Sequence, residues 1–156
     1  MRDAACALLC AASLAGCAAP SLPYGNFVRE APAGYDRTVA EDAVRQLAAV
    51  YPPAHTRFEL QQATPDAFGQ QLTASLRAKG YALRESTVSS AAQRKTAREE
   101  GGAAVGAAPV LPLRYVLDRA AELYRVTLLV GDQSLTRAYL AQDDTIHPAG
   151  AWVRKE

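Results

Sequence analysis

The chain has 156 residues, of which 49% are hydrophobic and 21% are charged, and its formal net charge is +1 at pH 7. This length predicts one main domain with a tail, and the near-neutral charge argues against broad electrostatic binding to nucleic acid. Alanine is concentrated at the N-terminus and again after Val88. We therefore expect neither of these two stretches to contribute to a hydrophobic core.

The N-terminal residues have the pattern of a bacterial lipoprotein signal. Residues 4–13 carry no charge, and this run has about half of the ~20 apolar residues that a membrane-spanning helix needs. The run ends in a stretch that resembles the bacterial lipobox, Leu14, Ala15, Gly16 and Cys17. Cleavage there would leave Cys17 as the new N-terminus, and its thiol would take the lipid. We predict a signal peptide over residues 1–16; the alternative is an alanine-rich N-terminal helix.

The cysteine positions agree with lipidation at Cys17. Cys6 and Cys10 lie in the segment that would be removed, so the mature chain would have no disulfide and would depend on its core alone. Diacylglycerol and palmitate on Cys17 would hold the protein in a membrane, since each buried methylene contributes ~0.8 kcal/mol. The next residue is Ala18 and not aspartate, which points to the outer membrane, with the protein facing the periplasm.

Residues 17–36 are predicted to be a lipidated tether, because prolines and glycines are frequent there and the apolar residues have no period. Fully extended, residues 18–36 would span at most ~60 Å. Tyr24 and Phe27 are exceptions, because an inert tether has no need of aromatic residues. The stretch PYGNFV around them is either a partner-binding strand or a segment that packs locally on the domain.

Residues 37–156 are predicted to form a periplasmic α+β domain that begins with a helix. Thr38 can cap this helix, Glu41 stands three residues later as in a capping box, and Pro52 ends it. Apolar residues alternate with polar ones around Phe58, which indicates a strand with one buried face.

A second helix is predicted to begin at Thr64-Pro65-Asp66, with Thr64 as the cap, Pro65 in the first turn and Asp66 as an early acid, and to stop at Gly80. Its large apolar residues recur at every fourth position and share one face: Phe68, Leu72 and Leu76. Another strand is expected from Tyr81. A strand, a helix and a strand in this order predict a parallel pair joined by a crossover.

Residues 89–108 are predicted to be a flexible insert, because they contain almost no large apolar residue. After the insert, apolar side chains alternate around Tyr115, Val126 and Leu135, and this predicts an antiparallel meander. A last short strand is expected near Trp152. The fold class is therefore α+β, a two-layer sandwich with two helices on a mixed four- to five-stranded sheet.

The sequence contains no recognisable catalytic or metal-binding motif. His55 and His147 have no neighbours at the spacing of metal ligands. Adjacent carboxylates such as Asp143-Asp144 lack the geometry of an acid–base pair or the spacing of a calcium loop. We expect no enzymatic activity, no metal, no cofactor apart from the covalent lipid, and no small-molecule substrate.

Two arginines, Arg114 and Arg125, fall between the apolar positions of two predicted strands. If the strand register allows, they form a basic strip on the exposed face of the sheet, and arginine is enriched at protein–protein interfaces. The alternative is plain solvation of that face. Arg137 fits such a strip less well, because it shares a face with Leu135 and Tyr139.

Five segments together resemble the TrbH family of conjugal transfer proteins. In chain order they are SLAGC, PYGNFV, YPPAHTRFEL, TPDAFGQQLTASLRAKGYAL and LYRVTLLVGDQSLTRAY, and the resemblance covers most of the mature chain apart from the insert. It implies an outer-membrane lipoprotein of a conjugative type IV secretion system. The implied partners are a periplasmic or outer-membrane subunit and an inner-membrane-anchored subunit that spans the periplasm. Only Cys17 and the lipobox before it carry over as site residues.

The leading hypothesis is a structural lipoprotein subunit that anchors or stabilises the outer-membrane complex of this plasmid-transfer apparatus. Its partners would be membrane lipid, through Cys17, and other channel subunits, but not nucleic acid. The alternative hypothesis is a stand-alone, periplasm-facing outer-membrane lipoprotein that binds and regulates a cell-envelope enzyme.

Overall fold

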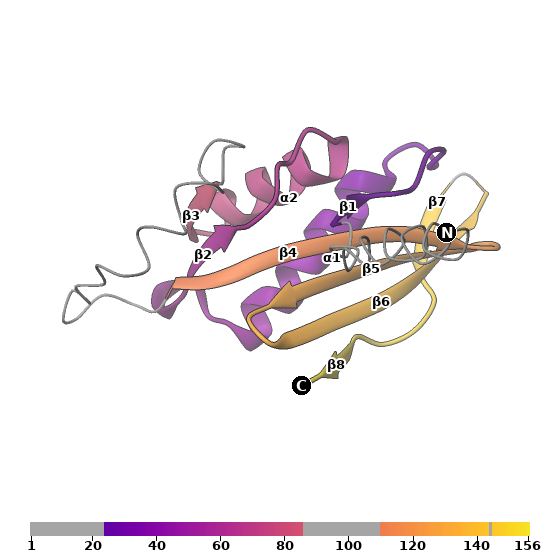
Figure 1. The fold of residues 1–156 in the computed structure, drawn as a ribbon. Coiled ribbons are helices and arrows are strands. Elements are labelled where there is room, and N and C mark those ends of the chain that lie inside the picture. The colour runs from indigo at the N-terminus through magenta and orange to yellow at the C-terminus, as the bar shows by residue number, and fades with distance from the viewer. Residues whose placement is uncertain (1–23, 86–109, 144) are drawn as a thin grey trace, which may run out of the picture.

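The structure is a computed structural model, and it describes residues 24–85, 110–143 and 145–156. Two helices lie on one side of a mixed β-sheet (Figure 1). The predicted signal peptide, the lipobox with Cys17, the first part of the predicted tether and the predicted insert at 89–108 lie outside the described residues.

The described residues form two α-helices, one 3-10 helix and eight strands. In chain order these are β1 (Gly25–Asn26), α1 (Tyr35–Val50), η1 (Pro53–His55), β2 (Arg57–Leu60), α2 (Ala67–Ala78), β3 (Ala82–Glu85), β4 (Val110–Ala120), β5 (Leu123–Val130), β6 (Gln133–Gln142), β7 (Thr145–Pro148) and β8 (Val153–Lys155). The two helices and the mixed sheet agree with the predicted α+β class, but the sheet has more strands than the four or five predicted. β8 corresponds to the last short strand expected near Trp152, whereas β7 was not predicted and β1, with two residues, is too short to show a period in the sequence.

The strand order is β3-β2-β4-β5-β6-β7. β2 is parallel to both β3 and β4, which confirms the predicted parallel pair, and β4 to β7 are antiparallel. β1 continues the edge of β4 beyond β2, while β8, directly after Trp152, pairs with β6 beyond β7. Because successive side chains of a strand point to opposite faces, this register places alternate residues of neighbouring strands side by side.

α1 begins one turn earlier than predicted. Gly34, in the left-handed region at φ 75°, precedes the helix, and no side chain caps it; the predicted cap at Thr38 is therefore wrong. The earlier start follows from Tyr35, which is 1% exposed and packs its ring against Tyr124 with 5.1 Å between the centroids. Burial of this aromatic residue outweighs the local capping signal. The helix ends before the two prolines, as predicted.

α2 begins two residues later than the sequence predicts, because its N-cap is Asp66 and not Thr64. The carboxylate of Asp66 accepts a hydrogen bond from the Gly69 N–H at 3.0 Å, an N-cap that also favours the helix dipole. It accepts a second bond from the Tyr115 hydroxyl at 2.5 Å, which fixes the start of the helix to β4. The three apolar residues predicted to share one face are fully buried: Phe68, Leu72 and Leu76.

A single hydrophobic core lies between the helices and the sheet. The sheet contributes alternate residues of its three long strands: Leu113, Tyr115 and Leu117 from β4, Tyr124, Val126, Leu128 and Val130 from β5, and Leu135 and Tyr139 from β6. The side chains between them lie on the opposite face, which neither helix covers (Figure 1). We call this second face the open face.

Candidate interaction surfaces

The open face combines apolar, hydroxyl and cationic side chains. Strand register places them in rows that cross the sheet. One row contains Arg114, Leu129, Ser134 and Lys155, and the next contains Val116, Thr127, Thr136 and Val153. The hydroxyl groups of Thr127 and Thr136 are hydrogen-bonded to each other at 3.1 Å.

Arg114 and Arg125 both lie on the open face, as the sequence predicts, but they stand in different rows. Arg114 is opposite Leu129, whereas Arg125 is opposite Asp118. Arg125 donates from Nε to Asp118 Oδ1 at 3.0 Å and from Nη2 to Oδ2 at 2.9 Å. These hydrogen bonds and the charge of Asp118 raise the pKa of Arg125 above its usual value. The predicted basic strip is therefore interrupted by an ion pair.

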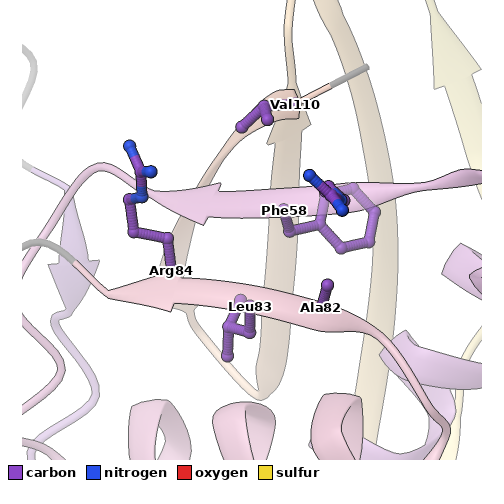
Figure 2. Close-up of a pocket in the computed structure, with 6 residues that line it drawn as sticks. Phe58, Ala82, Leu83, Arg84 and Val110 are labelled. Carbon is purple, nitrogen blue, oxygen red and sulfur yellow. The ribbon is translucent and has the colours of Figure 1, made fainter. Parts of the chain in front are cut away.

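Further arginines lie where the parallel strands β2 and β3 run beside the start of β4. A surface cavity of about 190 Å³ is lined there by Arg57, Phe58, Ala82, Leu83, Arg84 and Val110 (Figure 2). Arg84 Nη1 is 3.8 Å from Glu59 Oε1, and Arg57 stands between Ala82 and Val110 in the register of the three strands. A guanidinium group presents a planar fork of N–H donors that matches carboxylate and phosphate groups, so this cavity suits an anionic group.

Tyr24 and Phe27, the aromatic residues of the predicted tether, flank β1 at the edge of β4. The Arg114 guanidinium lies 4.9 Å from the centre of the Tyr24 ring, a cation–π contact. The Phe27 N–H donates to the Leu117 carbonyl at 2.8 Å, but its side chain is 48% exposed. The folded domain therefore reaches back to Tyr24, well inside the segment 17–36. A partner-binding role for the two aromatic residues stays a prediction.

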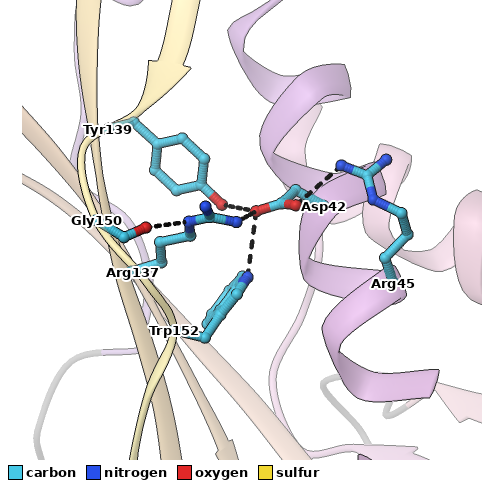
Figure 3. A network of polar contacts seen from close by, with 6 residues as sticks. All are labelled: Asp42, Arg45, Arg137, Tyr139, Gly150 and Trp152. Atoms are coloured by element: carbon cyan, nitrogen blue, oxygen red, sulfur yellow. Dashed lines mark hydrogen bonds and ion pairs between the residues drawn. The ribbon is translucent and has the colours of Figure 1, made fainter. Parts of the chain in front are cut away.

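On the helix side of the sheet, Asp42 of α1 joins the helix layer to the C-terminal strands (Figure 3). Its carboxylate accepts four hydrogen bonds, from Tyr139 Oη at 2.6 Å, Arg137 Nη1 at 2.8 Å, Arg45 Nη2 at 2.9 Å and Trp152 Nε1 at 3.2 Å. Arg137 also donates from Nε to the Gly150 carbonyl at 2.8 Å. These contacts hold β6 and the segment before β8 against α1.

Asp42 is ionised although it is only 7% exposed. Burial alone would raise its pKa, but the hydrogen bonds from Tyr139, Arg45 and Arg137, together with the charge of Arg137, outweigh burial and place the pKa below its ordinary value. Burial and the bond to Asp42 raise the pKa of Tyr139, so its hydroxyl stays a donor. Because both carboxylate oxygens already accept hydrogen bonds, we interpret this network as one that stabilises the fold.

None of these contacts was predicted from the sequence, although one signal was present. Arg137 has the same parity along its strand as Leu135 and Tyr139, and so it had to point toward the core. A charged residue at a buried strand position implies a buried partner of opposite charge. Nothing in the sequence pattern distinguishes Asp42 from the other acids as that partner.

A groove between α1 and α2 is a second candidate surface. It has a volume of about 320 Å³ and is lined by Glu41, Val44, Arg45, Ser75, Ala78 and Lys79. Val44 is buried, whereas the charged residues are exposed. An apolar floor with a charged rim is typical of sites that receive a side chain of a partner protein.

The candidates for chemistry named by the sequence remain apart. His55 lies in η1 and His147 in β7, and both are exposed. The described part of the chain contains no group of three or more histidine, cysteine or acidic residues that could hold a metal ion. Within the same residues, no helix is both long and apolar enough to span a bilayer.

The comparison with known families gives a clear result. The family described as "Conjugal transfer protein TrbH" matches residues 21–156. The chain belongs to the TrbH family. This confirms the resemblance carried by the sequence segments and implies a role in conjugal transfer. The TrbH match begins after the predicted lipobox, so it is silent on Cys17. The comparisons with curated proteins and with solved structures gave no match.

Proposed function

We propose that this chain is a structural, non-enzymatic lipoprotein subunit of a conjugative type IV secretion apparatus, in which it anchors or stabilises the outer-membrane complex. The observation that carries the proposal is the TrbH family match over residues 21–156. The lipobox sequence at residues 14–17 supports a covalent lipid on Cys17 and a position on the periplasmic side of the outer membrane.

We assign the groove between α1 and α2 to the contact with a neighbouring channel subunit. Its rim carries charges of both signs, Glu41 and Arg45 from α1 and Lys79 from the end of α2, while Val44 provides an apolar floor. Such a surface can bury an apolar side chain and orient it by ion pairs. The groove lies on the helix layer, so its use leaves the open face of the sheet accessible.

A mild-detergent pull-down tests this function. The protein, tagged at its C-terminus, is isolated from cells that carry its native gene cluster, and the bound proteins are identified by mass spectrometry. We expect channel subunits at a fixed ratio with the wild type. Ala78→Glu, which places a charge in the groove, is expected to lose them, whereas Ala49→Glu is the matched control, because Ala49 is also an exposed alanine near the end of a helix.

Three results of the pull-down would count against parts of this proposal. Recovery of a cell-envelope enzyme in place of channel subunits would favour the stand-alone regulatory lipoprotein. Equal recovery with Ala78→Glu and Ala49→Glu would remove the groove assignment and leave the subunit role intact. The absence of any partner with the wild type would contradict the subunit role itself.

The lipid anchor is tested separately by fractionating the cell envelope. Cys17→Ser is expected to leave an uncleaved precursor in the inner-membrane or soluble fraction, because the acceptor thiol is gone. Cys10→Ser is the matched control, since Cys10 lies in the segment that would be removed, and it is expected to be processed normally. Recovery of Cys17→Ser in the outer membrane at wild-type levels would contradict lipidation at this residue.

A further inference from the structure

The exposed large apolar side chains of the described residues gather at the open face. They are Phe27, Val110, Leu123, Leu140 and Val153, each between 40% and 64% exposed. Leu123 and Leu140 are direct neighbours on adjacent strands, Val110 stands beside Arg57, and Val153 stands beside Thr136. All four of these positions lie on the open face, and Phe27 follows β1 at its edge. α1 and α2 expose no apolar side chain of this size.

The charges of the open face are predominantly positive. Its strand positions carry the cations Arg57, Arg84, Arg114, Arg125 and Lys155 and the acids Glu59 and Asp118. Each acid lies next to an arginine, with 3.8 Å between Arg84 and Glu59 and 2.9 Å between Arg125 and Asp118. The face therefore has an excess of cations, and Arg57 and Arg84 border the cavity suited to an anionic group.

The tether joins the domain on the same side. Tyr24 is held against Arg114, a residue of the open face, by the cation–π contact at 4.9 Å and a hydrogen bond to its hydroxyl at 3.5 Å. Only six residues lie between Cys17 and Tyr24, and the seven steps from one to the other span at most ~25 Å when the chain is extended. A lipid on Cys17 would therefore keep the open face close to the bilayer, which is much nearer than the ~60 Å reach of a tether that ends at residue 36.

We propose that the open face lies on the phospholipid surface of the membrane that holds the lipid anchor. Apolar side chains such as Leu140 and Phe27 enter the interfacial region, while Arg57, Arg84 and Lys155 meet lipid phosphate groups. An apolar surface rimmed by cations is the composition that binds an anionic bilayer. The inference rests on the lipid anchor of the proposed function, and it leaves the helix layer with its groove facing the periplasm and the secretion apparatus.

Fluorescent probes on the lipidated full chain test this orientation. In the mature chain the thiol of Cys17 would be blocked by lipid, and Cys6 and Cys10 would be removed, so an introduced cysteine is the only reactive thiol. Leu140→Cys and Val110→Cys report on two ends of the open face, and Ala49→Cys on the helix layer is the control. The labelled proteins are reconstituted into vesicles of phosphatidylethanolamine and phosphatidylglycerol, and lipidation is checked by mass spectrometry.

We expect both open-face probes to show a blue-shifted emission, quenching by nitroxide-labelled lipids and protection from aqueous iodide. The probe at position 49 is expected to show none of these. Replacing Arg57 by glutamate should weaken the lipid quenching at position 140, whereas the matched change of the helix-layer residue Arg37 to glutamate should leave it unchanged. Raising the salt concentration should act in the same direction as the open-face charge reversal, because it screens the attraction to anionic lipid.

The possible outcomes separate the orientation from the anchor. An acylated protein whose open-face and helix probes are equally quenched by iodide overturns the orientation and leaves the anchor standing. Open-face probes that become protected only in envelopes containing the transfer apparatus show that this face binds a protein subunit, and they overturn the membrane proposal. A chain without acyl mass on Cys17 overturns both the anchor and the orientation that depends on it.

Discussion

An arginine–aspartate ion pair lies on each side of the sheet. The two pairs have similar N–O distances, but they differ in solvent exposure and in the number of hydrogen-bond donors around them. Arg137 and Asp42 are 2.8 Å apart on the helix side, and Arg125 and Asp118 are 2.9 Å apart on the open face. The side chains of the first pair are 19% and 10% exposed, and those of the second pair are 52% and 27% exposed. Among the described residues, further donors join only the first pair, from Tyr139, Arg45 and Trp152.

This difference shows how solvent decides the role of an ion pair. An exposed pair contributes about 0–1 kcal/mol to stability, because water competes for both charges. A buried pair costs much to desolvate, so removal of one partner leaves a charge without compensation and destabilises the fold by about 3–5 kcal/mol. The helix side is therefore the part of the sheet that maintains the fold, and the open face is the part that is available for contacts.

The largest expected loss of stability comes from a charge placed in the core on the helix side of the sheet. Phe68→Asp places a charge where the native ring is fully buried and packs on Tyr115 at 5.1 Å between centroids, and we expect the domain to be unfolded at 25 °C. Leu140→Asp is the control, because Leu140 is a large apolar residue of the open face that is 42% exposed. Circular dichroism during heating measures both. A cooperative transition at the wild-type temperature in Phe68→Asp would show that α2 does not pack as described.

The next effect compares the two ion pairs directly. Asp42→Asn is expected to lower the free energy of unfolding by about 3 kcal/mol, because Arg137 loses its buried countercharge. Asp118→Asn is expected to lower it by less than about 1 kcal/mol, because Arg125 remains solvated. Urea denaturation measures both values. Equal losses in the two variants would mean that the faces do not differ in solvent access as the structure describes.

Some parts of this fold were predictable because their signals are local. The stretch in which α2 begins was predicted from its capping signals, although the N-cap is Asp66 and not Thr64. The buried face of that helix was predicted from Phe68, Leu72 and Leu76, since periodicity depends on neighbours in the chain. The start of α1 was not predicted, because it depends on the packing of Tyr35 against Tyr124, which are far apart in the sequence. Local packing of PYGNFV on the domain, which β1 provides, was one of two alternatives for this segment, and two residues show no period that could decide between them.

For the surfaces too, features that depend on local sequence were predictable and features that depend on distant residues were not. Strand alternation placed Arg114 and Arg125 on the exposed face correctly, and it set Arg137 apart from them. It could not reveal that Asp118 stands opposite Arg125, because that fact depends on the register between β4 and β5. The Asp42 network and the interhelical groove depend on how the layers meet, and the local sequence pattern does not encode this.

A smaller difference in stability is expected between the phenylalanine variants of two buried tyrosines on the helix side. Tyr115→Phe is expected to lower the free energy of unfolding by about 2 kcal/mol, because its hydroxyl donates to the charged N-cap Asp66. Tyr35→Phe is expected to be neutral or stabilising, because the buried Tyr35 hydroxyl has no hydrogen-bond partner among the described residues. Urea denaturation of both variants measures the difference. A loss in Tyr35→Phe as large as that in Tyr115→Phe would show that the Tyr35 hydroxyl is bonded in solution.

The smallest effect concerns two aspartates of α1 whose pKa values move in opposite directions. Burial and the charge of Asp66 raise the pKa of Asp36 above its ordinary value, and one of its carboxylate oxygens is buried with no hydrogen-bond partner in the described part of the chain. The ionised Asp36 therefore destabilises the fold at neutral pH, and this cost disappears as the pH falls through its folded pKa toward the unfolded value of about 3.9. Asp36→Asn is expected to raise the melting temperature slightly at pH 7 and to leave it unchanged near pH 3.

The sign is reversed for Asp42, and this makes the pair of variants a sharper test than either one alone. The pKa of Asp42 is lowered, so its contribution to stability is present above the unfolded pKa and is lost as the pH falls through the folded value. Asp42→Asn should therefore be most destabilising at pH 7 and approach the wild type in strong acid. Melting temperatures between pH 2 and pH 7 measure both curves. If both substitutions shifted the melting temperature in the same direction at pH 7, the environment described for one of the two carboxylates would be wrong.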